Sequence, residues 1–176
     1  PDFNLIPLDI AKNIPSDKKA EFLTTNTDNK SIIINNINLL DSELCWLLDD
    51  SDSDLIHKKV PGSTIKHITE ALINRNFHSK NSILLFNTKS AVFISANCDN
   101  KFKIINRFPV SNEDDLLYYT LLTIKETGLS KKKFTIDYHG VKKDIFIQKL
   151  TTILPKCTIE HAENNSYLSI LNWGSL

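Results

Sequence analysis

In the second half of this chain the hydrophobic pattern changes its period near residue 110, and this change limits the folds open to it. Before that point, three apolar segments alternate in the manner of strands and are joined by short polar turns. After it, apolar residues recur at helical spacing, and helices then alternate with strands. The predicted strands lie at 82–87, 91–97, 102–108, 134–138 and 157–161, and the predicted helices at 111–128, 143–154 and 166–173.

The helix after the period change carries its own start and stop signals. Ser111 is expected to be its N-cap, with Asp114 in an approximate capping box, and Gly128 to mark its C-terminal end. The resulting order is β-β-β-α-β-α-β-α, an antiparallel meander followed by crossovers whose strands return parallel to the first. This order resembles the ribonuclease-H-like fold, which the actin-like ATPase superfamily shares. We therefore predict an α/β fold class, with a mixed sheet of this kind over residues 81–176.

The first half is predicted to be a separate α/β lobe over residues 1–80, incomplete if part of the protein precedes it. A helix over 63–77, with Ser63 or Thr64 as its cap, is expected to connect the two lobes. Residues 44–48 fit either a strand or a short helix, because periodicity does not decide so short a segment. The other expected elements are strands at 3–7 and 30–38, mostly helical structure at 9–26 and a polar loop at 49–54.

Charge and hydropathy exclude several classes of partner. The chain has 21 basic and 21 acidic residues, so no overall field attracts it to nucleic acid or to an anionic membrane. No apolar run approaches the roughly 20 residues that cross a bilayer. The widely spaced cysteines form no C-x-x-C pair, so we expect small buried thiols rather than disulfides or a zinc site. These cysteines are Cys45, Cys98 and Cys157.

The start of the sequence has neither a signal peptide nor a methionine. Residues 1–10 lack the basic and apolar regions that direct secretion, which favours a cytoplasmic location. Because the sequence contains no methionine at all, we expect it to be part of a longer protein or to lack some residues.

Three segments resemble an uncharacterised bacterial family, a domain of unknown function. They are Phe3–Pro7, Ile105–Phe108 and the helix Glu113–Leu121, in which acidic residues precede Leu-Tyr-Tyr. The resemblance extends from about Phe3 to Glu160. It implies an actin-like ATPase fold, distantly similar to pilus-assembly and secretion proteins, and an N-terminal lobe that lies partly outside this sequence. The family brings no established activity to this chain.

The nucleotide chemistry of such a fold is poorly represented. An actin-like ATPase holds phosphate at the turn after the first strand of each lobe, with glycine for close approach and aspartate to organise magnesium. The corresponding turn of the second lobe, 86–90, has neither. Gly140 follows the strand 134–138, where such folds approach adenosine, and is the one candidate for nucleotide binding. A plain strand-end turn is the favoured interpretation, so we expect no ATP hydrolysis and no cofactor.

Metal-dependent chemistry is also disfavoured. A ribonuclease-H nuclease needs several carboxylates around two metals, but the strand 82–86 has none, and Asp137 alone is expected to be a hydrogen-bonded or strand-edge residue. The acidic run 50–54 resembles a calcium loop but has Leu55 and Pro61 where glycine and glutamate are needed. The five histidines have no ligand at metal-binding spacing, so we expect no metal site and no catalytic residue.

Two clusters are candidates for an interaction surface. The lysine runs 131–133 and 142–143 are more typical of a solvated turn than of a nucleic-acid site, because no aromatic residues are interleaved to stack bases. Two adjacent tyrosines project about 100° apart on their helix, so one is expected in the core and the other partly exposed as an anchor for a protein partner. The candidate residues are Tyr118, Tyr119, Lys131, Lys132 and Lys133.

Three functions remain open from the sequence. The favoured one is a non-catalytic actin-like-fold protein that acts through protein contacts, as a scaffold or self-associating assembly component. The second is an ATP-binding protein whose phosphate loops lie outside this segment, which a D-x-G turn upstream of Pro1 would favour. The third, a nucleic-acid enzyme of the ribonuclease-H class, needs carboxylates that the sequence lacks. Enzymatic activity is undecided, with the balance against it.

Overall fold

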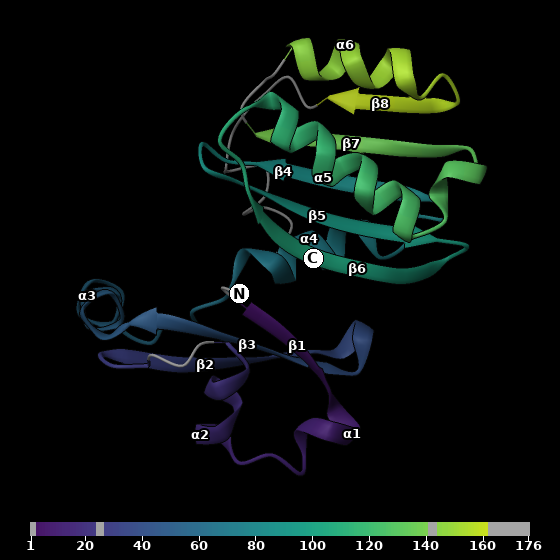
Figure 1. Ribbon diagram of the computed structural model, residues 1–176. Coiled ribbons are helices and arrows are strands. Elements are labelled where there is room, and N and C mark those ends of the chain that lie inside the picture. Colours follow the sequence, from purple (N-terminus) through teal and green to yellow (C-terminus); the bar gives the residue numbers. More distant parts are fainter. Residues whose placement is uncertain (1–2, 24–26, 141–143, 162–176) are drawn as a thin grey trace. The chain divides into compact units, whose positions relative to one another are not determined.

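The computed structural model divides the chain into two compact units (Figure 1). Unit 1 spans Pro1–Glu70 and unit 2 spans Ala71–Leu176, so the boundary falls inside the helix α4 (Ile68–Asn76). None of the helices in the described part of the chain is long and apolar enough to cross a membrane. The described residues are 3–23, 27–140 and 144–161.

Unit 1 is built on a three-stranded antiparallel sheet of order β1-β3-β2. The central strand β3 (Ser42–Asp49) pairs with β1 (Phe3–Pro7) on one side and with β2 (Lys30–Ile37) on the other. The β-branched run in β2 suits a pleated strand. Residues 44–48 are therefore strand, which is the first of the two structures that their pattern allowed.

One face of this sheet packs against short helices. Helices α1 (Leu8–Ala11) and α2 (Ser16–Lys19) each follow a proline, Pro7 and Pro15, at the position where a helix needs no amide donor. The 3₁₀ helix η1 (Ala20–Phe22) continues directly from α2. Together they give the mostly helical structure predicted for this segment. The buried cluster that they share with the sheet is Ile6, Ala11, Leu23 and Cys45.

The predicted polar loop at 49–54 is wrong, because helix α3 occupies Asp50–Lys59. Its first turn contains Asp50 and Asp52 and its last turn contains His57 and two lysines, charges that favour both ends of the helix dipole. The 3₁₀ helix η2 (Asn38–Leu40) lies between β2 and β3.

The helix predicted over 63–77 is too long at its start, because α4 begins only at Ile68. The preceding residue explains the difference. The centroid of the His67 ring lies 5.2 Å from that of Phe3 and 5.2 Å from that of Trp46, and these contacts hold His67 in a segment outside any helix. Tertiary packing here overrides a local preference for helix.

Unit 2 contains the predicted mixed sheet, in the order β6-β5-β4-β7-β8. The first three strands form an antiparallel meander, and the last two lie parallel to β4 and to each other. Asp99 and Asn100 have φ of 56° and 59° in the two-residue turn between β5 and β6, as a tight hairpin requires. The strands are β4 (Ser82–Asn87), β5 (Ala91–Cys98), β6 (Lys101–Pro109), β7 (Phe134–Gly140) and β8 (Cys157–His161).

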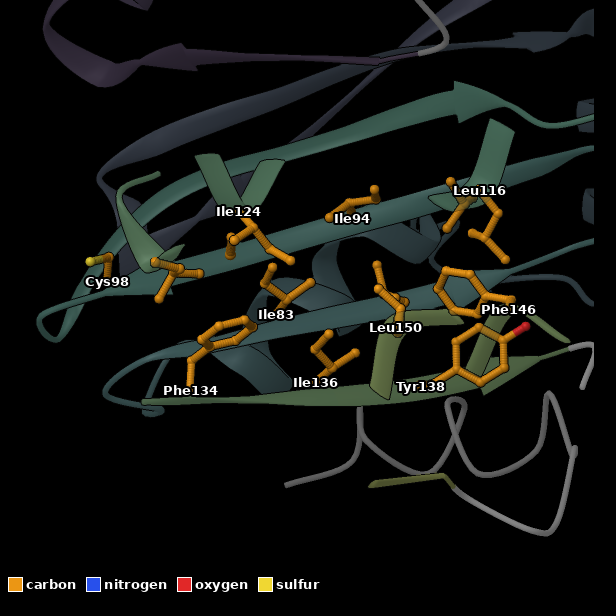
Figure 2. Packing of buried hydrophobic residues seen from close by; sticks show 14 residues of the cluster. Ile83, Ile94, Cys98, Leu116, Ile124, Phe134, Ile136, Tyr138, Phe146 and Leu150 are labelled. Carbon is orange, nitrogen blue, oxygen red and sulfur yellow. The ribbon is translucent and has the colours of Figure 1, made fainter. Parts of the chain in front are cut away.

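Helices α5 (Glu113–Glu126) and α6 (Asp144–Ile153) cover one face of this sheet. Figure 2 shows side chains from both helices and from β4, β5 and β7 meeting in a single core. Leu116, Tyr138 and Phe146 are among the fully buried members. On the opposite face, the side chain of Asn76 at the end of α4 bonds the hydroxyl groups of two strand serines. Those serines are Ser82 of β4 and Ser95 of β5.

The N-cap of α5 lies one residue later than predicted. Asn112 Oδ1 accepts the amide hydrogens of Asp114 and Asp115 at 2.8 and 2.9 Å, and the Asp115 carboxylate accepts those of Ser111 and Asn112 in return. This is a complete capping box, with Asn112 and Asp115 in place of Ser111 and Asp114. Gly128 follows the helix with φ of 79°, as predicted for a helix end, and leads into the 3₁₀ helix η3 (Leu129–Lys131). The helix predicted at 166–173 lies outside the described residues.

Candidate functional site

The turn after β4 is where a fold of this kind would hold a phosphate group. Here the turn is closed by its own atoms. The Thr88 amide and hydroxyl groups both donate to the Ala91 carbonyl at 2.8 Å, and the hydroxyl oxygen accepts the Ala91 amide at 3.1 Å. Amide groups that are satisfied within the turn are not available to phosphate oxygens.

The last residue of β4 is Asn87, which is buried at the start of this turn. Its Nδ2 donates to the hydroxyl oxygen of Tyr138 at 3.0 Å. Burial raises the pKa of Tyr138 to about 12, so the hydroxyl stays protonated at neutral pH. Asn87 therefore places a neutral amide where magnesium coordination would call for a carboxylate.

Gly140 lies opposite Asn87 in the parallel pairing of β4 with β7. Its φ is 100°, and a Cβ atom at this position would lie 1.9 Å from the Asn87 carbonyl oxygen. The approach of two backbones thus accounts for this glycine without any ligand. Gly140 also belongs to strand β7 itself, which runs two residues beyond the predicted end at Tyr138.

These contacts test whether the turn of unit 2 fits a magnesium nucleotide, and it does not. The amides of Thr88 and Ala91 donate to acceptors within the turn, the strand end carries no carboxylate, and the space beside the glycine is filled by protein backbone. The first 61 residues of the chain contain no glycine at all. No step of ATP hydrolysis follows from these residues.

The two tyrosines of α5 differ as the helical geometry predicts. Tyr119 packs against the core, and its ring stacks on that of Phe108, with centroids 4.5 Å apart and planes 14° apart. Tyr118 is 61% exposed and touches the edge of the Tyr119 ring at a centroid distance of 5.2 Å. Tyr119 is thus a packing residue, and Tyr118 is the exposed member of the pair.

The lysines of the predicted basic cluster do not act together. Lys132 Nζ lies 2.6 Å from both carboxylate oxygens of Asp99, in the turn between β5 and β6. Lys131 is exposed at the end of η3, whereas Lys133 lines a polar hollow on the sheet. The second lysine run, 142–143, lies outside the described residues.

The sequence did not predict a cluster of charged side chains that joins β7 to α4. Asp137 Oδ1 lies 2.7 Å from His139 Nε2, and Asp137 Oδ2 lies 3.3 Å from the guanidinium of Arg75 on α4. Burial opposes ionisation of Asp137, but the hydrogen bond and charge of His139 and the charge of Arg75 outweigh it and lower the pKa of the carboxyl group. Asp137 is thus hydrogen-bonded, as predicted. The spacing of Asp137 and His139 could have predicted their contact, because residues two apart on a strand lie on the same face.

The thiol groups of Cys45 and Cys157 are not activated for chemistry. Burial raises the pKa of Cys45 and of Cys157 to about 11, which keeps both thiols protonated and weakly nucleophilic at neutral pH. Cys45 and Cys98 are buried as predicted, but Cys157 is only partly buried, because it begins the edge strand β8. Among the residues that the structure describes, no three His, Cys, Asp or Glu side chains are grouped to hold a metal ion.

The chain has an actin-like ATPase fold. A crystal structure from Bacteroides thetaiotaomicron VPI-5482, described as a protein with actin-like ATPase fold and unknown function, matches it with a TM-score of 0.77 at 18% identity. This match covers 97% of the present chain and 69% of the other. The family model described as "Protein of unknown function (DUF3822)" matches residues 1–157, and the chain belongs to this family. The predicted fold and the resemblance to a family of unknown function are thereby confirmed.

Two further comparisons add nothing to the assignment. Pelota from Archaeoglobus fulgidus matches with a TM-score of 0.34 and 8% identity, over 77% of this chain and 40% of that one, which is too weak a likeness to carry an argument. No curated protein matches the sequence.

Proposed function

We propose that this protein is a non-catalytic member of the actin-like fold that acts through protein contacts, as a scaffold or self-associating assembly component. The closed turn after β4 carries this proposal. The Thr88 and Ala91 amides donate to acceptors within the turn, and the backbone of Gly140 packs closely against the Asn87 carbonyl, at the position where such folds approach adenosine. If the turn does not bind phosphate, the protein acts through contacts made by its surface.

The outer side of α5 and α6 is the surface that best fits this role. Asp114 of α5 pairs with Lys149 of α6 at 2.6 Å. Tyr118 lies one turn after Asp114, and Ile145, which is 56% exposed, lies one turn before Lys149. An exposed aromatic side chain and an exposed aliphatic one beside an ion pair are typical of a protein contact, in which tyrosine is a frequent anchor.

The first test is thermal unfolding of the full-length protein with and without millimolar Mg-ATP. We expect no change in the midpoint. A ligand at one hundred times its Kd would stabilise the protein by about 2.7 kcal/mol, which such an experiment detects. A clear rise would contradict the proposal and would favour a nucleotide-binding protein whose phosphate loops lie outside this chain.

The second test is sedimentation velocity over the micromolar range. We expect the wild-type protein to associate with rising concentration and the double variant Tyr118→Ser/Ile145→Ser to remain monomeric. Glu126→Ser, an exposed change on the same helix as Tyr118, is the control and should associate as the wild type does. A wild-type protein that stays monomeric would exclude self-association and would leave a different protein as the partner to be sought.

A further inference from the structure

A polar hollow of about 590 Å³ lies within unit 2, on the face of the sheet opposite α5 and α6. Its wall is the end of α4 and the segment leading into β4. Its volume falls within the roughly 300–1,000 Å³ that is typical of small-molecule sites. The side chains of its floor alternate along three parallel strands and are Ser82, Leu84, Thr135, Asp137, Thr158 and Glu160.

Three lysines gather at this hollow because of the topology. Lys80 lies just ahead of β4, Lys133 just ahead of β7 and Lys156 just ahead of β8. Parallel strands start at the same edge of a sheet, so these residues come together although they are far apart in the sequence. Within the described part of the chain, none of the three forms an ion pair, so their charges face the hollow and solvent.

The acidic residues of the hollow do not cancel these charges. Asp137 is already matched by the guanidinium of Arg75 at 3.3 Å and by His139 at 2.7 Å. Glu160 is the other carboxylate of the lining. Three lysines against this one glutamate leave two positive charges in excess, on a chain whose net charge is zero.

Hydrogen bonds hold the backbone at Lys133 in place. Asn81 Nδ2 donates to the Lys133 carbonyl oxygen at 3.4 Å, and Asn81 Oδ1 accepts the amide hydrogen of Asp99 at 2.9 Å. The amide of Thr135 also donates to the carbonyl of Asn81, at 3.2 Å. A backbone held in this way reduces the ordering that binding would otherwise require.

We propose that this hollow binds a small organic anion with at least two phosphate or carboxylate groups. The lysine ammonium groups bind the anionic groups, the hydroxyl groups of Thr135 and Thr158 donate to them, and Glu160 accepts from a hydroxyl or amine of the same ligand. A small molecule fits better than nucleic acid, because the hollow has the volume of a small-molecule site and the chain as a whole has no net positive charge. This inference concerns a different site from the turn after β4 on which the function proposed above rests.

The test measures binding of two probes, inorganic pyrophosphate and citrate, to the full chain by thermal unfolding and isothermal titration calorimetry. We expect at least one of them to raise the unfolding midpoint and to bind less tightly as the salt concentration increases. Pyrophosphate binding alone identifies a phosphate ligand, and citrate binding alone identifies a carboxylate ligand. Stabilisation by neither probe overturns the proposal.

A pair of charge-reversal variants locates the site. Lys133→Glu/Lys156→Glu changes two exposed residues of the hollow and should weaken probe binding about tenfold or more. Lys101→Glu/Lys103→Glu makes the same change on the exposed start of β6, whose residues do not line the hollow, and should leave binding unchanged. Equal binding by both variants overturns the proposal. Repeating the Mg-ATP experiment with these variants separates the two proposals, because nucleotide bound at this hollow would lose affinity only in the first.

Discussion

Replacing Gly140 with alanine would place a methyl carbon 1.9 Å from the carbonyl oxygen of Asn87 and 2.8 Å from its carbonyl carbon. Both obstacles are backbone atoms of β4, which is paired with β5 on one side and β7 on the other, so neither can turn away as a side chain would. The φ of 100° adds a second penalty, because L-residues rarely adopt it. Overpacking costs about 1–3 kcal/mol. Backbone strain costs about 1–3 kcal/mol more, which gives an expected loss of about 2–6 kcal/mol.

The matched control is Gly128→Ala. Gly128 also has a left-handed φ, 79°, but no atom lies within 4 Å of the added methyl group, so only the backbone penalty of about 1–2 kcal/mol applies. Urea unfolding followed by far-ultraviolet circular dichroism measures the free energy of unfolding of both variants. If Gly140→Ala were no less stable than Gly128→Ala, the close approach of β7 to Asn87 would be refuted, and with it the argument that the phosphate turn is filled.

Two further predictions concern α5 and β7. Tyr119→Ala should lower the free energy of unfolding by about 2 kcal/mol through loss of the stack on Phe108, and Tyr118→Ala by less than about 0.5 kcal/mol, as urea midpoints will show. Equal losses would contradict the assignment of one tyrosine to the core and one to the surface. Because the pKa of Asp137 is lowered in the folded state, its contribution to stability is present above the unfolded pKa and is lost as pH falls through the folded pKa. The difference in urea midpoint between wild type and Asp137→Asn should therefore reach its full value at about pH 6 and disappear below about pH 4. A difference that does not change with pH would argue against ionisation of Asp137.

The sheet of unit 2 could be predicted because each of its elements carries a local signal. Alternating apolar residues mark the strands, Asp99-Asn100 suits the turn between β5 and β6, and the change to helical period after Pro109 marks α5. The parallel return of β7 and β8 followed from the element order alone, since a crossover helix between strands brings the second strand back parallel to the first.

The errors fall where local signals are weak or are overridden. Helix α3 has no buried residue in the described structure, so it lacks the apolar stripe by which a helix is recognised. Its run of aspartates therefore led to the prediction of a loop. The start of α4 was misplaced because the ring contacts of His67 with Phe3 and Trp46 join residues far apart in the chain. No window of sequence contains such a contact.

Some parts of the candidate site could be predicted from the sequence and others could not. The closed turn depends on the Asn87–Gly140 register and on the amide and hydroxyl groups of Thr88, which no spacing rule provides. The hydrogen bond from Arg75 on α4 to Asp137 on β7 likewise joins residues that are 62 positions apart in the sequence. By contrast, the gathering of Lys80, Lys133 and Lys156 could have been predicted, because each precedes a strand that the element order makes parallel.

The two ends of the parallel strands therefore have opposite characters. In open α/β sheets, ligands usually bind beyond the carboxyl ends of the strands. Here the backbones of Asn87 and Gly140 approach each other closely at the carboxyl ends of β4 and β7, while Lys80, Lys133 and Lys156 lie at the amino ends of the parallel strands. A ligand site on this unit would accordingly lie at the edge where the strands begin. Loss of the phosphate turn and gain of an anion site elsewhere are compatible within one sheet, because the two ends share strands but no side chains.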